Sequence, residues 1–379
     1  MVAILGVGTT RFTQKLERTI VSLGVEAARL ALSDAGLAPA QIDGAFVANA
    51  LGGMLFGDTT IGQTQLREVG LRRLPVVNVE NACTSGSSAL WLAWNAVSAG
   101  QMEAALVLGV ERMCVPTLGL INSGRTEIDT LLGLVTPASF ALRAQRHMHE
   151  FGTTREQMAA VVEKSRRHGA LNPNALFQHA ESSADVLAGP AVADPLTRSE
   201  CCPIADGASA LVIGSDRLAR ELGAGVRIDS IALASGGYEN PADLARWETD
   251  TETAAAAYAR AYHAAYTAIK QADPSAQIAI GGVSQITPLR LAYLDAVLAA
   301  YHAEFGVKMP VDVWNMHAFV LQEKAGGWGV DVRPGLELRR CRGGVLARAG
   351  DVLRLAQREA RAGGLLAPER LEPRYLRGS

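Results

Sequence analysis

Lysine is scarce in this sequence of 379 residues, and several other features are missing. Five lysines occur, and every other basic residue is arginine. Five cysteines are too few for a disulfide scaffold and fit a reducing compartment, so we expect a cytoplasmic protein. No uncharged apolar run of about 18 residues occurs, which argues against a membrane span. A formal net charge of -2 argues against nucleic acid as the main partner.

The charge is unevenly distributed along the chain. Residues 333–379 contain 11 arginines and five acidic residues, a local charge of +6, so the rest of the chain carries -8. The same C-terminal stretch has poor hydrophobic periodicity. We therefore interpret residues 337–379 as an Arg-rich tail that differs in kind from the preceding chain.

The sequence does contain a regular alternation of apolar runs and helical patterns. Hydrophobic residues make up 49% of the chain, which is enough for a large core. Residues 115–200 are more polar and mostly helical, which predicts an inserted lobe. The alternation on either side of this lobe is typical of a layered α/β fold. Strands are predicted at 2–8, 42–48, 76–79, 104–109, 208–214, 226–234, 277–283 and 310–314, and helices at 20–35, 85–99, 139–151, 154–168, 251–271 and 288–305.

Cys83 is the strongest candidate for chemistry. It follows one predicted strand and precedes a predicted helix that is rich in small residues. The unpaired N–H groups and the positive dipole end of a helix start favour the thiolate, which is the nucleophilic form of cysteine. The alternative is a buried structural cysteine. The position between a strand and a helix favours the nucleophile.

Several blocks, in the right order, resemble the thiolase superfamily, in particular the sterol-carrier-protein-type thiolases. Asn81-Ala-Cys-Thr-Ser-Gly86 is similar to the nucleophile motif of that family, and Ala105–Met113 is similar to the strand that follows it. Phe140–Asn172 resembles the loop domain, and Val192–Gly207 resembles the segment that returns from it. The resemblance covers residues 2–250, about two thirds of the chain.

This resemblance implies a thiolase-like layered α-β-α fold with an inserted helical loop domain. It implies that Cys83 is acylated by an acyl-CoA, which is a substrate and not a bound cofactor, and we expect no metal. Arg143 and Arg146 become candidates for contact with the CoA phosphates, with a solvated helix face as the alternative. Thiolase-like subunits commonly dimerise through the N-terminal half, and some relatives pair with a small OB-fold acyl-CoA-binding protein.

The C-terminal motifs of the family are not intact in this sequence. No Gly-His-Pro occurs, and Cys341 does not match the second-cysteine loop of the family. The last histidine, His317, lies in Trp314-Asn-Met-His-Ala-Phe319, which loosely resembles a His-Asp-x-Phe segment. His317 is therefore a candidate catalytic residue, and a structural or sugar-site histidine is the alternative. We expect a C-terminal half that is incomplete or replaced, and catalysis that is weak or absent.

Residues 258–336 instead resemble a fragment of a bacterial glycoside-hydrolase-like (β/α) barrel. About 80 residues cannot close a barrel of roughly 250, so a complete glycosidase is excluded. We expect a thiolase-like N-terminal domain at 1–114 and 201–225, a loop domain at 115–200, the start of a C-terminal half at 226–257, the barrel-like fragment at 258–336 and the tail at 337–379.

The leading hypothesis is a thiolase-like acyl-CoA acyltransferase of lipid metabolism that uses Cys83 as its nucleophile. A non-catalytic thiolase-like scaffold or partner subunit is the alternative from another class. Glycan binding by the 258–336 fragment is a third, more remote alternative.

Overall fold

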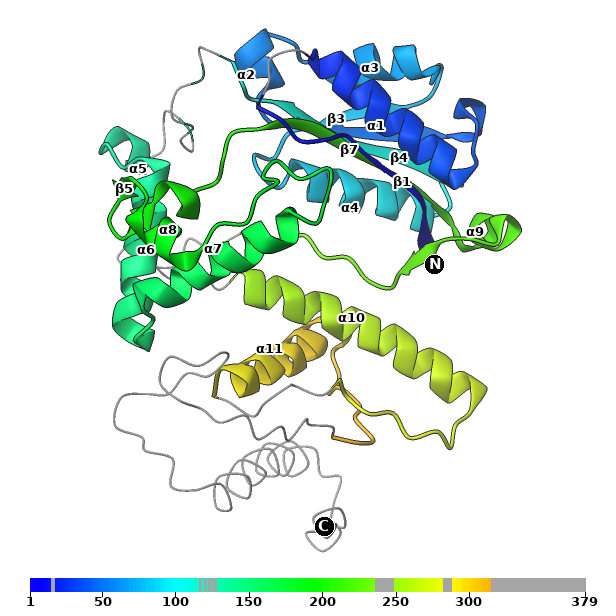
Figure 1. Ribbon diagram of the computed structural model, residues 1–379. Helices are drawn as coiled ribbons and strands as arrows, with labels where there is room; N and C mark the ends of the chain where they lie inside the picture. Colours follow the sequence, from blue (N-terminus) through cyan, green and yellow to red (C-terminus); the bar gives the residue numbers. More distant parts are fainter. Residues whose placement is uncertain are drawn as a thin grey trace, which may run out of the picture. The chain divides into compact units, whose positions relative to one another are not determined.

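The chain forms two compact units, Met1–Arg246 and Trp247–Ser379, in the computed structural model (Figure 1). The structure describes residues 1–14, 18–115, 118, 121, 124, 128–235, 249–281 and 288–314. Among the described residues, no helix is both long enough and apolar enough to cross a membrane.

The first unit is built on a six-stranded mixed sheet with the strand order β3-β2-β4-β7-β1-β8. Strand β2 runs parallel to β3 and β4, whereas β7 runs antiparallel to both β4 and β1. The carboxyl ends of β1 to β4 therefore meet the amino end of β7 at one edge, which we call the carboxyl edge. The strands are β1 (Val2–Thr9), β2 (Gly44–Ala48), β3 (Val76–Val79), β4 (Ala104–Arg112), β7 (Asp206–Ser215) and β8 (Val226–Ile228).

Helices cover both faces of this sheet, which confirms the predicted layered α/β fold (Figure 1). On one face, Leu23 and Ala27 pack against Leu106 in a fully buried cluster. On the other face, Ala89 packs against Val107. The first face is covered by α1 (Ile20–Ala35), α3 (Ile61–Val69) and α9 (Asp216–Leu222), and the second by α4 (Ser85–Ser98).

Strand β1 approaches α1 closely because two of its residues on that face are glycine. A Cβ atom at Gly6 would lie 2.4 Å from the backbone oxygen of Ala31. A Cβ atom at Gly8 would lie 2.3 Å from the backbone oxygen of Ala27. Both contacts are with helix backbone, which cannot move aside as a flexible side chain would. The glycines therefore set the spacing between this strand and its helix.

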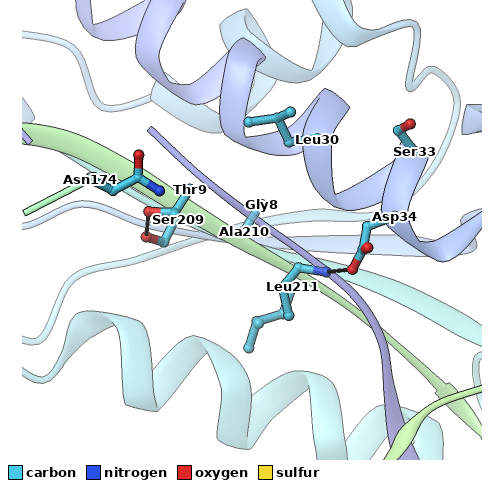
Figure 2. A pocket seen from close by; sticks show the side chains of 10 residues that line it. Gly8, Thr9, Leu30, Ser33, Asp34, Asn174, Ser209, Ala210 and Leu211 are labelled. Atoms are coloured by element: carbon cyan, nitrogen blue, oxygen red, sulfur yellow. Dashed lines mark hydrogen bonds between the residues drawn. The ribbon is translucent and has the colours of Figure 1, made fainter. Parts of the chain in front are cut away.

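A pocket of about 690 Å³ is lined by the end of β1, by the residues of β7 that pair with it and by α1 (Figure 2). On its outer edge, only Val2–Ile4 of β1 pair with β8. Asp34 of α1 reaches this edge, where its carboxylate accepts a hydrogen bond of 2.8 Å from the Val7 N–H. The carboxylate satisfies a strand donor and places a charge on the edge, and both effects oppose pairing with another strand. Cys83 does not line this pocket.

The segment predicted as an inserted lobe, residues 115–200, is mostly helical where the structure describes it, and its status as a separate domain stays a prediction. A capping box begins one of its helices: Thr154 accepts a hydrogen bond from the Gln157 N–H, and the Gln157 side chain accepts one from the Thr154 N–H. The described elements are α5 (Ile128–Leu131), α6 (Thr136–Phe151), α7 (Arg155–Gly169), α8 (Ser183–Ala188) and the short hairpin of β5 (Ala191–Ala193) with β6 (Leu196–Thr197).

The second unit is described over two helices, α10 (Thr249–Ala272) and α11 (Pro288–Phe305). Tyr301 is buried between them, and its hydroxyl lies 2.7 Å from Nδ1 of His263. The helices predicted at 251–271 and 288–305 are confirmed. Within the described residues, the strands predicted at 277–283 and 310–314 are reduced to one parallel bridge between Ala279 and Val313. The barrel-like origin of this unit stays a prediction.

Three described helices of the first unit that lie outside the inserted lobe, α2 (Gly52–Phe56), α3 and α9, were not predicted from the sequence. Helix α2 and then α3 occupy the segment between the predicted strands 42–48 and 76–79. The strand predicted at 226–234 ends at Ile228, which already pairs with Val2, the first residue of the antiparallel β1.

Candidate active site

Cys83 lies at the carboxyl edge, on the turn that joins β3 to α4. Its thiol is exposed and not part of a disulfide. Ala82, the residue before it, has φ 45°, a left-handed conformation that is strained for any residue with a Cβ. Helix α4 then begins at Ser85, two residues after Cys83. The sequence therefore predicted this strand–cysteine–helix junction correctly.

Short hydrogen bonds brace this turn on both sides of the cysteine. The Asn81 N–H donates to Oγ of Ser85 at 2.8 Å, and Ser85 in turn donates to the Ala82 carbonyl at 2.7 Å. The Asn81 side chain donates to Oγ of Ser88 at 2.8 Å. These contacts hold the strained Ala82 in place, and they explain the serines of the motif. The motif thus fixes the backbone around an accessible thiol, the arrangement a nucleophile needs.

A second network occupies the carboxyl edge between β2 and β4. Asn49 follows β2, and its side-chain amide donates to the Glu111 carboxylate at 2.9 Å and to the Val110 carbonyl at 2.8 Å. The Ala50 N–H donates to the same carboxylate at 2.8 Å. Burial raises the pKa of Glu111, while the hydrogen bonds from Ala50, Leu51 and Asn49 oppose that rise.

A buried carboxylate, Asp206, lies at the amino end of β7. It is 1% exposed, and its Oδ1 accepts hydrogen bonds from the N–H groups of Met113 and Cys114 at 2.7 and 2.8 Å. Burial and the neighbouring Asp206 charge raise the pKa of the Cys114 thiol to about 11. Cys114 is therefore protonated at neutral pH, and a protonated thiol is a poor nucleophile.

The other candidate residues are not brought to Cys83 by any contact in the described structure. Arg143 and Arg146 both lie on α6, where Arg143 stacks over the Phe140 ring at 5.1 Å and Arg146 pairs with Glu150. Their role towards CoA stays a prediction. His317 and Cys341 lie outside the described residues. Within the described chain, no group of three or more side chains could hold a metal ion.

Sequence reasoning did not single out Asn49 or Glu111 as parts of this edge, whereas the family resemblance places Asp206 at a strand entrance near the active site, and β7 does begin there. Glu111 stands inside the block Ala105–Met113 that carried the family resemblance, but its partners precede it by more than 60 residues. The only available signal was a polar residue at the end of an apolar strand. That signal does not reveal which groups the side chain hydrogen-bonds to.

The family model of the thiolase N-terminal domain matches residues 2–184. This range holds β1 to β4, the Cys83 turn and most of the inserted lobe. Together with the curated relatives below, it shows that the N-terminal part of the chain belongs to the thiolase superfamily and is similar to the sterol-carrier-protein-2 type.

Curated relatives are similar to part of the chain. The benzoylsuccinyl-CoA thiolase subunit BbsB of Thauera aromatica is 36% identical over 263 residues, covering 67% of this chain and 66% of the relative. Human sterol carrier protein 2 is 34% identical over 238 residues, covering 59% and 43%. An acetyl-CoA acetyltransferase of Methanothermobacter thermautotrophicus is 34% identical over 239 residues, covering 62% of each chain. The chain therefore spans less than two thirds of the length of these relatives.

Two solved structures support the fold. The Ltp2–ChsH2(DUF35) aldolase aligns with a TM-score of 0.55 and 27% sequence identity, covering 69% of each chain. A monomeric SCP2-thiolase-like protein of type 1 from Mycobacterium smegmatis aligns with a TM-score of 0.56 and 20% identity, covering 69% of this chain and 57% of that one. The expectation of a thiolase-like layered fold is thus confirmed.

Proposed function

We propose that this protein transfers acyl groups from acyl-CoA through Cys83. The thiolate of Cys83 attacks the carbonyl carbon of the thioester, the carbonyl oxygen takes the negative charge, and the C–S bond to CoA breaks. The products are an acyl-cysteine thioester and the CoA thiolate. The Cys83 N–H, beside the start of α4, is the proposed donor to the oxyanion.

One observation carries this proposal: the exposed Cys83 thiol on a strained, braced turn at a helix start, inside a thiolase N-terminal domain. A cysteine kept only for packing would be buried, and the turn around it would need neither the left-handed Ala82 nor the bracing serines. The named relatives include acyl-CoA enzymes, which agrees with a CoA thioester as the substrate class.

We further propose that turnover is slow. The sequence has no Gly-His-Pro, and within the described residues no histidine hydrogen-bonds to Cys83. General-base activation of a nucleophile contributes about 100- to 10,000-fold to a rate, so its absence should leave a nucleophile that reacts but does not cycle efficiently.

The test is incubation of the protein with acetyl-CoA followed by intact-mass measurement. We expect a stable adduct of one acetyl group per chain and slow cleavage of acetoacetyl-CoA. Robust turnover of acetoacetyl-CoA would contradict the proposed impairment while leaving acyl transfer intact. If no adduct forms on a folded protein, the acyl-transfer proposal fails.

We propose a homodimer that forms through the N-terminal half. The support is β3, which is the terminal strand of the described sheet and leaves Val77 41% exposed. Lysine at this position should oppose edge pairing, so Val77→Lys is expected to convert a dimer to a monomer in sedimentation velocity. Val226→Lys on β8, at the opposite end of the sheet, is the matched control, because Val226 is also exposed. A dimer that persists in Val77→Lys contradicts this interface.

A non-catalytic partner subunit is the second candidate. BbsB is named as a thiolase subunit, and the similar aldolase structure combines Ltp2 with ChsH2(DUF35). A small OB-fold acyl-CoA-binding partner would fit this alternative. Failure of the acyl-adduct test on a folded protein would favour it.

A further inference from the structure

Glu111 at the end of β4 holds a turn that belongs to a different strand. Its two carboxylate oxygens accept hydrogen bonds from the Asn49 side chain at 2.9 Å and from the Ala50 N–H at 2.8 Å. The turn is closed on its far side, where the Gly52 N–H donates to Oδ1 of Asn49 at 2.6 Å. A Cβ atom on Gly52 would lie 2.3 Å from that same oxygen, so the turn has no room for a side chain at this position.

The same turn is tied to the strand that leads to Cys83. The Asn49 N–H donates to the Val79 carbonyl at 3.1 Å. Val79 is the last residue of β3, and three residues separate it from Cys83. One residue earlier, the Asn78 side chain accepts a hydrogen bond from the Gly62 N–H of α3 at 2.8 Å. An unbroken path of short contacts therefore runs from Glu111 through Asn49 to the end of β3.

We propose that Glu111 is a positioning residue, which fixes the end of β3 and so the placement of the Cys83 backbone N–H for acyl transfer. This inference rests on the proposed acyl transfer. An oxyanion donor acts only when it is held close to the place where the charge develops, and removing one such donor typically costs 100- to 1,000-fold in rate. A partial displacement should cost about tenfold.

A carboxylate suits this place because it only accepts hydrogen bonds. The groups that hydrogen-bond to it include the Asn49 amide and the backbone N–H groups of Ala50 and Leu51, all of which are donors. A glutamine has the same shape but carries an N–H donor in place of one acceptor oxygen, so at least one of these contacts becomes a clash between donors. Glu111→Gln therefore changes the turn without opening a cavity.

The experiment compares Glu111→Gln with the wild-type chain in three measurements. We expect acylation of Cys83 by acetyl-CoA to fall about tenfold or more, while alkylation of Cys83 by iodoacetamide, which needs no oxyanion donor, stays within about twofold. Amide hydrogen exchange should speed up about fivefold or more over residues 49–52 and 79–85. Glu103→Gln is the matched control, because Glu103 precedes the opposite end of β4, where it pairs with Arg217. It should change none of the three.

Each outcome decides something. Unchanged exchange over 79–85 in Glu111→Gln overturns the proposal. Equal losses of acylation and alkylation also overturn it, because they show a role in general stability alone. If the wild type is not acylated but the exchange result holds, the acyl-transfer function fails while the placement of the turn by Glu111 stands. Glu111→Asp keeps the charge and should recover part of the acylation rate.

Discussion

Replacement of Cys83 by alanine is expected to abolish the acyl adduct completely. The adduct requires a sulfur nucleophile at the carboxyl edge, and alanine leaves the turn intact, since the bracing contacts come from Asn81 and Ser85. We expect at least a 1,000-fold loss of acylation rate, about the effect of removing a catalytic nucleophile. Intact-mass spectrometry after incubation with acetyl-CoA measures it. Persistence of the adduct in Cys83→Ala would show that another side chain is acylated.

The other cysteines provide the controls for this result. Cys202 is also exposed and free, so Cys202→Ala should leave the adduct unchanged. Cys114, with its pKa raised to about 11, has about one thiolate in a thousand molecules at pH 8. Iodoacetamide at pH 8 should therefore label Cys83 and leave Cys114 unmodified, which peptide mapping can read.

Substitution of Gly8 by alanine is expected to destabilise the first unit by about 3 kcal/mol. The added methyl carbon would lie 2.3 Å from the Ala27 carbonyl oxygen and 2.5 Å from the Ala31 nitrogen. Relief requires α1 to move away from β1, which opens the buried cluster around Leu23 and Ala27. The midpoint of urea unfolding measures the loss.

Gly53→Ala is the matched control for this prediction. Gly53 lies in α2, and a Cβ atom there meets no heavy atom within 4 Å. Alanine favours the helix and reduces the freedom of the unfolded chain, so we expect no loss of stability and a gain of up to about 1 kcal/mol. An equal loss in both variants would mean that the contact between β1 and α1 is not the cause.

The Cys83 junction was predictable because its information is local. A short apolar strand, a cysteine and a run of small residues follow one another within a few positions, and each carries its own signal. The helices at 20–35 and 288–305 were predicted for the same reason. In α1, Thr19 caps the start, and Gly36 ends the helix in the left-handed conformation.

Helix α3 was missed because one of the residues that it buries in the core is polar. Gln65 is fully buried, so the apolar pattern of this segment is interrupted at a core position. The Glu111 network was missed for a different reason. Its partners lie 61 and 62 residues away in sequence, and only the parallel pairing of β2 with β4 brings them together.

The position of β7 also determines when this domain can fold during synthesis. Strand β7 lies between β4 and β1, and it begins at Asp206, almost 200 residues after β1 ends. A ribosome must therefore release more than half of the chain before the first strand made can pair. Until then, the edges of β1 and β4 stay open to other chains. The inserted lobe lengthens that interval, so the unpaired strand edges stay exposed to chaperones and to aggregation for longer.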